Sequence, residues 1–166
     1  MRFIATVALI LGLASGAFAQ SDEFQTQNSV VLGGPKNIDL AAGAVAIQSG
    51  DYDTGIERTL KGLEDETLRP HERSAGLSNL CGAYAAKQLP ESAIRYCTES
   101  LAYDDHNWRA YNNRSYAYWI MGRYPEAQAD LEAATALNPN ARQPGQIRGM
   151  INEKRLRPNI VMEDLQ

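Results

Sequence analysis

The feature that most constrains the fold of this chain is a spacing of 34 residues between similar side chains. Tyr84 and Tyr118 are 34 positions apart, and Ala93 and Ala127 share the same spacing. A fixed period of this length is typical of helical-repeat arrays, in which each unit buries its apolar face against its neighbours. The predicted units cover about residues 36–69, 74–107 and 108–141.

Each unit is expected to form two antiparallel helices. In the second unit Leu77, Cys81 and Tyr84 recur at the spacing of one helix face, and Pro90 then opens a partner helix. The spacing between the first and second units exceeds 34 residues by about four. We expect residues 69–72, at the junction of the two units, to account for the extra length. No strand-like alternation of useful length occurs, so the sequence predicts an all-α protein.

The third unit closely resembles the tetratricopeptide-repeat (TPR) family. The family's aromatic, small, tyrosine, glycine, alanine and proline positions correspond to Tyr111, Ser115, Tyr118, Gly122, Tyr124, Ala127, Ala134 and Pro139. The second unit departs from the pattern with Asp105 where the family has proline, and the first has glycine at two alanine positions. The resemblance implies a right-handed α-solenoid of three TPR helix hairpins.

A solenoid end would expose an apolar face, so we expect a polar capping helix. Residues 143–157 carry a narrow apolar stripe among charged residues and are predicted to form this cap, which brings the TPR domain to residues 36–157. The segments 20–35 and 158–166 are expected to be flexible tails.

The N-terminus reads as a secretory signal peptide. Arg2 precedes an apolar run over residues 3–13, and Ala17 and Ala19 supply small residues before a predicted cleavage after residue 19. The alternatives are a membrane anchor or a buried helix, but the run is shorter than the roughly 20 residues that span a bilayer. We expect a periplasmic or secreted protein that does not insert into a membrane once cleaved.

Charge and motifs argue against several functions. The chain carries 16 basic and 20 acidic residues, a net charge of −4, which gives no electrostatic footprint for nucleic acid. His71 and His106 fall at unit junctions and read as structural or solvated side chains. No catalytic or nucleotide-binding signature is present, so we predict no catalytic residue, no metal site and no cofactor.

Cys81 and Cys97 are the only cysteines and lie at equal distances from Leu89, where the turn of the second hairpin is centred. Residues equidistant from an antiparallel turn are neighbours, and an exported protein keeps its disulfides. The sequence favours a disulfide between them. The alternative is a pair of buried free thiols.

The family resemblance implies that the first helix of each hairpin lines a concave, peptide-binding face. Leu40 and Ala44 are expected on this face of the first unit. The candidate partner-binding residues are Asn79, Arg109, Asn112, Asn113, Tyr116 and Trp119. Asn79 and Arg109 match the clamp with which some family members hold a C-terminal carboxylate, but the other clamp positions do not match. Alternatively, Tyr116 and Trp119 pack on the capping helix or a tail.

These observations predict a non-catalytic adaptor or scaffold of the bacterial cell envelope, which binds a protein or peptide partner. A self-associating structural protein is the alternative, and a cell-wall-active enzyme is a more remote one because no carboxylates cluster outside the repeat pattern.

Overall fold

The computed structural model describes residues 37–156, and side chains as far as residue 153. This part of the chain forms seven α-helices and contains no strand. The helices are α1 (Ile38–Gln48), α2 (Tyr52–Leu63), α3 (Pro70–Ala86), α4 (Pro90–Tyr103), α5 (Trp108–Ile120), α6 (Tyr124–Leu137) and α7 (Gln143–Leu156). The predicted signal peptide and the predicted tails, 20–35 and 158–166, lie outside the described residues.

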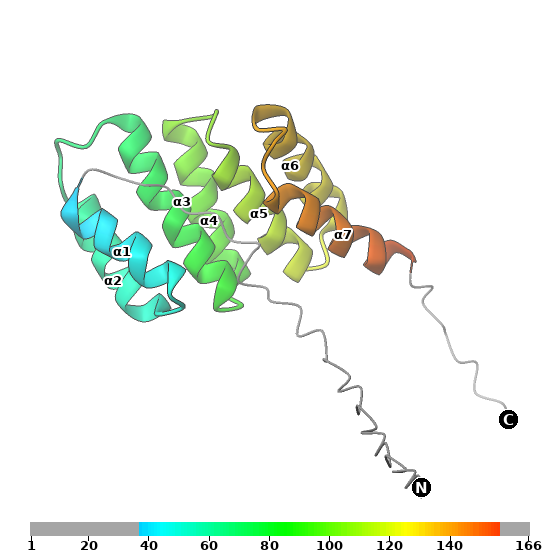
Figure 1. Cartoon of the computed structure of the whole chain (residues 1–166), viewed down its shortest axis with the longest axis horizontal. Helices are drawn as coiled ribbons and strands as arrows, with labels where there is room; N and C mark the ends of the chain where they lie inside the picture. Colours follow the sequence, from blue (N-terminus) through cyan, green and yellow to red (C-terminus); the bar gives the residue numbers. More distant parts are fainter. Residues whose placement is uncertain (1–36, 157–166) are drawn as a thin grey trace, which may run out of the picture.

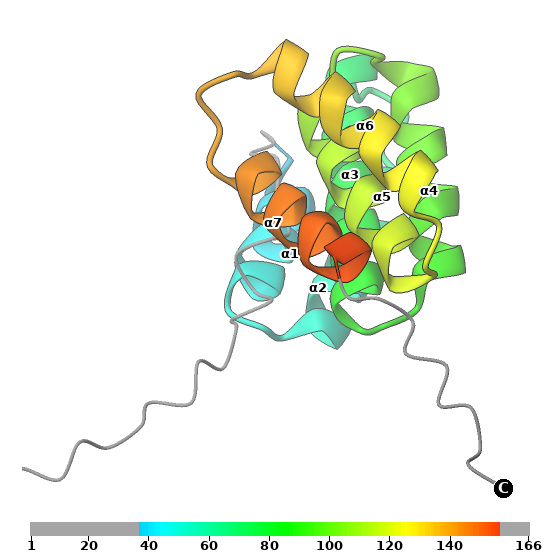
Figure 2. The same cartoon turned by 90° about the vertical axis from the view of Figure 1, so that its right-hand side faces the viewer.

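The helices form three consecutive hairpins, α1/α2, α3/α4 and α5/α6, which stack side by side and are followed by α7 (Figure 1). Contacts join α1 to α3, α3 to α5 and α5 to α7, so the first helices and α7 lie along one side of the array. Figure 2 shows α4 and α7 on opposite sides of α3 and α5. The predicted all-α helical-repeat solenoid is confirmed.

Short polar residues and prolines set the helix starts. The Asn37 side chain accepts hydrogen bonds from two backbone N–H groups in the first turn of α1, and Asn107 does the same for α5. Prolines occupy the first turns of α3, α4 and α6, where a missing N–H costs little. The turn of each hairpin contains one residue of left-handed backbone conformation. These residues are Gly50, Gln88 and Gly122.

The second hairpin differs from the expected boundaries because α3 begins at Pro70 instead of residue 74. Residues 69–72, expected to absorb the longer first spacing between units, instead form the start of this helix. The Glu72 carboxylate accepts a hydrogen bond from the Arg69 backbone N–H at 3.1 Å and pairs with the Arg69 guanidinium. These hydrogen bonds hold the pKa of Glu72 at about 2 and close the first turn of a 17-residue helix.

Glycines explain why the first hairpin departs most from the repeat pattern. A Cβ atom on Gly62 would lie 2.7 Å from Cγ of Leu40, and one on Gly55 would lie 3.0 Å from the backbone nitrogen of Ile47. Both distances are below ordinary van der Waals contact. The backbones of α1 and α2 therefore approach more closely than alanine would allow.

A disulfide joins the two helices of the second hairpin. Cys81 in α3 and Cys97 in α4 are bonded, with their Cα atoms 5.2 Å apart, inside the usual range for this bond. Neither cysteine is exposed. The structure thus has the bridge that the sequence favoured, not the alternative of two free thiols.

We predict that removing this bridge lowers the free energy of unfolding by about 3 kcal/mol, because the bond restricts the unfolded chain over a loop of this size. The comparison is between the wild type and the Cys81→Ala/Cys97→Ala variant in urea unfolding followed by circular dichroism. A reductant should lower the urea midpoint of the wild type and leave that of the double variant unchanged. Equal midpoints for the two proteins without reductant would contradict the prediction.

An ion pair with little exposure joins the two helices of the third hairpin, and its arginine also bonds to the second hairpin. The guanidinium of Arg114 in α5 donates two hydrogen bonds to the Asp130 carboxylate in α6, at 2.7 and 2.8 Å, and one to Thr98 in α4 at 3.1 Å. The two charged side chains are 17% and 9% exposed. Burial alone would lower the pKa of Arg114, but the hydrogen bonds and charge of Asp130 raise it.

Asp130→Ala should destabilise the protein by about 3 kcal/mol, because it leaves the arginine charge partly buried without its partner. The matched control is Glu126→Ala, which removes the partner of Arg123 in an ion pair whose side chains are both more than 40% exposed. Exposed pairs contribute little, so the control should unfold almost as the wild type does. Thermal and urea unfolding of both variants would measure how much stability each one loses. Equal losses of stability in Asp130→Ala and Glu126→Ala would refute the prediction.

Candidate functional site

The side of the array formed by α3 and α5 carries two asparagines at equivalent repeat positions. Asn79 lies two residues before Cys81, which is bonded to α4, and Asn113 lies two residues before Ser115, whose Oγ donates to the Ala127 carbonyl of α6 at 2.6 Å. Two residues along a helix correspond to a rotation of about 160° between side chains. Both asparagines therefore point away from the second helices. We call this side the inner face, and it consists of Ser78, Asn79, Arg109, Asn112, Asn113, Tyr116 and Trp119.

The inner face is more buried than the sequence predicted. Asn79, Asn112 and Asn113 were expected on an exposed concave surface, and each is 0% exposed. The Asn113 amide donates to the Ser78 carbonyl oxygen at 3.1 Å, and Asn112 donates to the Asn113 side chain at 3.4 Å. The three asparagines are therefore buried, and the Asn113 side chain joins α5 to α3.

The two aromatic candidates pack toward α7. Tyr116 and Trp119 are stacked on each other with ring centroids 5.9 Å apart, and they share a hydrophobic cluster with Ile147 and Ile151. This is the alternative arrangement foreseen from the sequence, in which the aromatic residues pack on the capping helix. Burial raises the pKa of Tyr116. In this conformation Tyr116 is not an exposed anchor.

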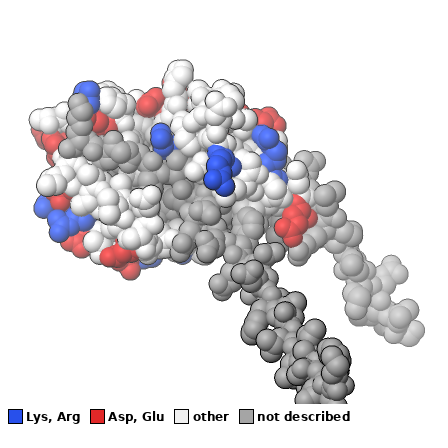
Figure 3. Space-filling view, in the orientation of Figure 1, with Lys and Arg blue, Asp and Glu red and all other residues white. Residues whose placement is uncertain are grey.

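Arg109 is the charged member of the inner face. Its guanidinium lies over the Trp108 ring, 4.8 Å from the centroid. Burial lowers its pKa, and no carboxylate among the described residues offsets that shift. In the space-filling view acidic side chains lie mainly at the margins of the visible face, whereas some basic ones lie nearer its middle (Figure 3). The inner face thus presents a cation to any acidic group that reaches it.

Several buried polar atoms near this face have no hydrogen-bond partner among the described residues. They are Ser78 Oγ, Arg109 Nε, Trp119 Nε1 and, on α7, Gln146 Oε1. Buried polar groups are nearly always satisfied by protein groups or ordered water, so these atoms are able to take up further hydrogen bonds. Sequence reasoning missed Gln146, because α7 lies outside the repeat register and gave no signal for its orientation.

The first hairpin does not extend this surface as expected. Leu40, predicted on the concave face, is fully buried, and both Gly62 and Gly76 are positioned against it. It belongs to the core between the first two hairpins. Ala44 is only partly buried and adds no polar group. The polar part of the inner face is therefore confined to α3 and α5.

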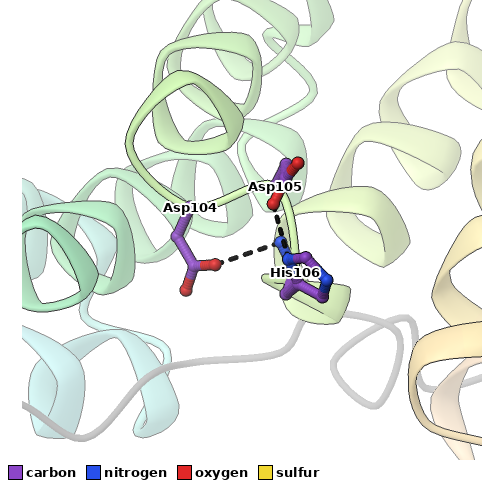
Figure 4. A group of neighbouring side chains, drawn as sticks. All are labelled: Asp104, Asp105 and His106. Carbon is purple, nitrogen blue, oxygen red and sulfur yellow. Dashed lines mark hydrogen bonds and ion pairs between the residues drawn. The ribbon is translucent and has the colours of Figure 1, made fainter.

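A small acidic group lies in the turn between α4 and α5. Asp104, Asp105 and His106 place their side-chain ligand atoms within 4.8 Å of one another (Figure 4). Asp105 pairs with the His106 ring at 2.5 Å, and Asp104 accepts the His106 backbone N–H at 3.0 Å. Asp105 and His106 are largely exposed. These contacts are those of a solvated turn, and nothing else at the turn points to a metal ion.

None of the described helices is long and apolar enough to span a membrane.

Comparison with known proteins agrees with the geometry. Residues 108–141 match the tetratricopeptide-repeat family. The chain is 33% identical over 88 residues to DnaJ homolog subfamily C member 3 of Mus musculus, a match that covers 53% of this chain and 16% of the mouse protein. The match to the rat protein of the same name covers 15% of its length at 35% identity. The chain thus corresponds to a small part of these relatives.

Solved structures show the same fold. The Arabidopsis OM64 TPR domain superposes with a TM-score of 0.62 at 19% identity, covering 70% of this chain and 93% of that domain. The first TPR of Spaghetti (RPAP3), solved with the HSP90 peptide SRMEEVD bound, gives 0.62 at 22% identity and covers 71% and 94%. Together with the repeat match at 108–141, these superpositions show that the described helices form a tetratricopeptide-repeat fold.

Proposed function

We propose that this chain is a non-catalytic protein-interaction module whose inner face binds an extended segment of a partner protein. The observation that supports this most is the set of unpartnered buried atoms, Ser78 Oγ, Arg109 Nε and Trp119 Nε1. An extended backbone offers one donor and one acceptor per residue, and such groups would satisfy the free polar atoms. The RPAP3 domain, bound to a peptide, has the same fold.

The partner segment is proposed to carry an acidic side chain opposite Arg109. This guanidinium is partly buried beside Trp108 and receives no charge compensation from a carboxylate of the described residues. A carboxylate there would form a charge-assisted hydrogen bond. Because the other clamp positions do not match, we propose recognition of an internal acidic residue instead of a chain terminus.

The proposed place of action is the bacterial periplasm, where the chain would serve as an adaptor or scaffold for envelope proteins. The basis is the N-terminal pattern of Arg2, an apolar run and Ala17 and Ala19, together with a disulfide that is stable in an oxidising compartment.

The test is capture of partners from a periplasmic extract by the wild type and by Arg109→Glu. Charge reversal should reduce the amount of the captured partner at least about tenfold, because it places two like charges together. The matched control is Arg95→Glu, which changes an exposed arginine on α4, away from the inner face. Both variants should retain the wild-type circular dichroism spectrum. Equal capture by Arg109→Glu and Arg95→Glu would count against the proposed face.

A second candidate function, self-association, is favoured by the apolar surface of α1. Ile38 and Val45 are 81% and 66% exposed and lie seven residues apart, on one side of the first helix of the array. This function predicts dimers or larger assemblies that dissociate in the Ile38→Asp/Val45→Asp variant. Light scattering over a range of concentrations measures this, and a wild type that stays monomeric throughout would exclude it.

A further inference from the structure

The two ends of the array differ in the character of their outer sides. In Figure 1, α1 and α2 lie at one end and α7 lies at the other. The outer side of α7 is polar, and Arg142 and Asn152 are exposed there. On α1 the exposed residues include Ile38 and Val45, and Asp39 is the only charged residue of the helix. The terminal unit of a repeat array ordinarily has a polar outer side, so the α1 end is the one without a cap.

The exposed apolar residues of α1 form a stripe along the helix. Ile38, Ala42 and Val45 follow the i, i+4, i+7 spacing of one helix side, and all three are exposed. Gly43 and Ile47 are buried on the opposite side. The helix is therefore apolar on both sides, which is typical of a helix that packs against other elements on both sides.

Resting on the proposed self-association, we propose that α1 of a second copy covers this stripe, with the two helices antiparallel and related by a twofold axis. Ile38 of each copy then lies opposite Val45 of the other, and the axis passes between Ala41 and Ala42, halfway between them. Small side chains at the crossing allow the two helices to approach closely. The assembly closes as a dimer, because each copy uses the same surface once.

The charges around the stripe are complementary in this arrangement. Near the first turn of α1, Arg58 and Lys61 of α2 share the carboxylate of Asp39, which leaves one excess positive charge. At the other end of α1, the exposed Asp51 accepts a hydrogen bond from the Thr54 backbone N–H at 3.2 Å. Antiparallel pairing brings the basic end of each copy to the acidic end of the other, so opposite charges meet at both ends of the interface.

Head-to-tail stacking, in which α1 packs on α7 of the next copy, is less favourable. The stripe would then lie against Arg142 and Asn152 on the outer side of α7. Burying these polar groups against apolar side chains costs free energy, because Ile38 and Val45 offer them no hydrogen bond. Stacking would also leave an uncovered stripe at the end of every assembly, whereas the twofold dimer covers both stripes.

The dimer is expected to be weak and bivalent. α1 has 11 residues and is about 16 Å long, so one pair of these helices buries less than the roughly 800 Å² per partner of a stable complex. Dimers should therefore form at micromolar or higher concentrations. Each copy contributes its own inner face on α3 and α5, so a partner with two acidic segments would be held more strongly than a partner with one.

A single introduced cysteine tests the placement. The two cysteines of the chain form the buried Cys81–Cys97 bond, so Ala42→Cys supplies the one free thiol. Mild oxidation of this variant, as the chain from residue 20 onward, should give covalent dimers at high protein concentration. Glu99→Cys, exposed on α4, is the control and should remain monomeric. If Ala42→Cys forms dimers no faster than Glu99→Cys does, the proposed pairing is wrong.

Exchange of charges tests the twofold arrangement. Asp51→Lys and Lys61→Glu each bring like charges together at both ends of the interface, so each variant alone should dimerise at least about tenfold more weakly than the wild type. Mixed in equal amounts, the two variants should form heterodimers about as readily as the wild type forms homodimers, because opposite charges then meet at both ends. Sedimentation equilibrium measures both effects, and a mixture without rescue overturns the twofold pairing.

Folding of the variants is checked by circular dichroism. Asp51→Lys removes the side-chain oxygen that caps α2. If this variant does not fold, Asp51→Asn keeps a capping oxygen and removes the charge, and it should still weaken the dimer. An Asp51→Asn protein that dimerises as the wild type does would contradict the proposed charge contacts.

The hypotheses fail separately. If the wild type self-associates and a mixture of the Ala42→Cys and Asn152→Cys proteins crosslinks while Ala42→Cys alone does not, the twofold pairing is refuted and self-association stands. If the wild type is monomeric at every concentration and Ala42→Cys gives no covalent dimer, both are refuted. Partner capture by the inner face, tested with Arg109→Glu, does not depend on either result.

Discussion

Each hairpin depends on a close approach of its two helix backbones at one pair of small residues. The equivalent pairs are Gly43–Gly55, Cys81–Ala93 and Ser115–Ala127. In the first hairpin a Cβ atom on Gly43 would lie 3.0 Å from the Gly55 carbonyl oxygen. In the third, the Ser115 hydroxyl donates directly to a backbone carbonyl of α6. A larger side chain would separate the helices, and because each hairpin packs on the next, the displacement would pass along the array.

The same contacts orient the inner face. Since Cys81 and Ser115 must face the second helices, the residues two positions earlier, Asn79 and Asn113, must face the opposite side. The core register of α3 and α5 therefore determines which polar side chains can meet a bound chain. The cation of Arg109 lies on this same side because it precedes Asn113 by four residues, about one turn.

The sequence was informative where a period or a short-range rule operates. The 34-residue spacing predicted the helical hairpins, and the symmetric placement of Cys81 and Cys97 favoured their bond. The sequence was not informative where burial depends on which other elements pack against a helix. The burial of Asn79 and of Leu40 follows from such neighbours, and the period of a single helix does not specify them. The early start of α3 was missed because Pro70 was assigned to a connection, although proline is favoured in a first turn.

The unpartnered polar atoms of the inner face also lower the free energy of unfolding. A buried polar atom without a partner costs about 1–3 kcal/mol, against a total stability of about 5–15 kcal/mol for a typical domain. Ser78 and Arg109 lie in the second and third hairpins, which the Cys81–Cys97 bond and the Arg114–Asp130 ion pair also strengthen. These cross-links compensate locally for the cost of the polar face. A chain that satisfies the free atoms binds only the folded state, so binding on this face and folding of these hairpins stabilise each other.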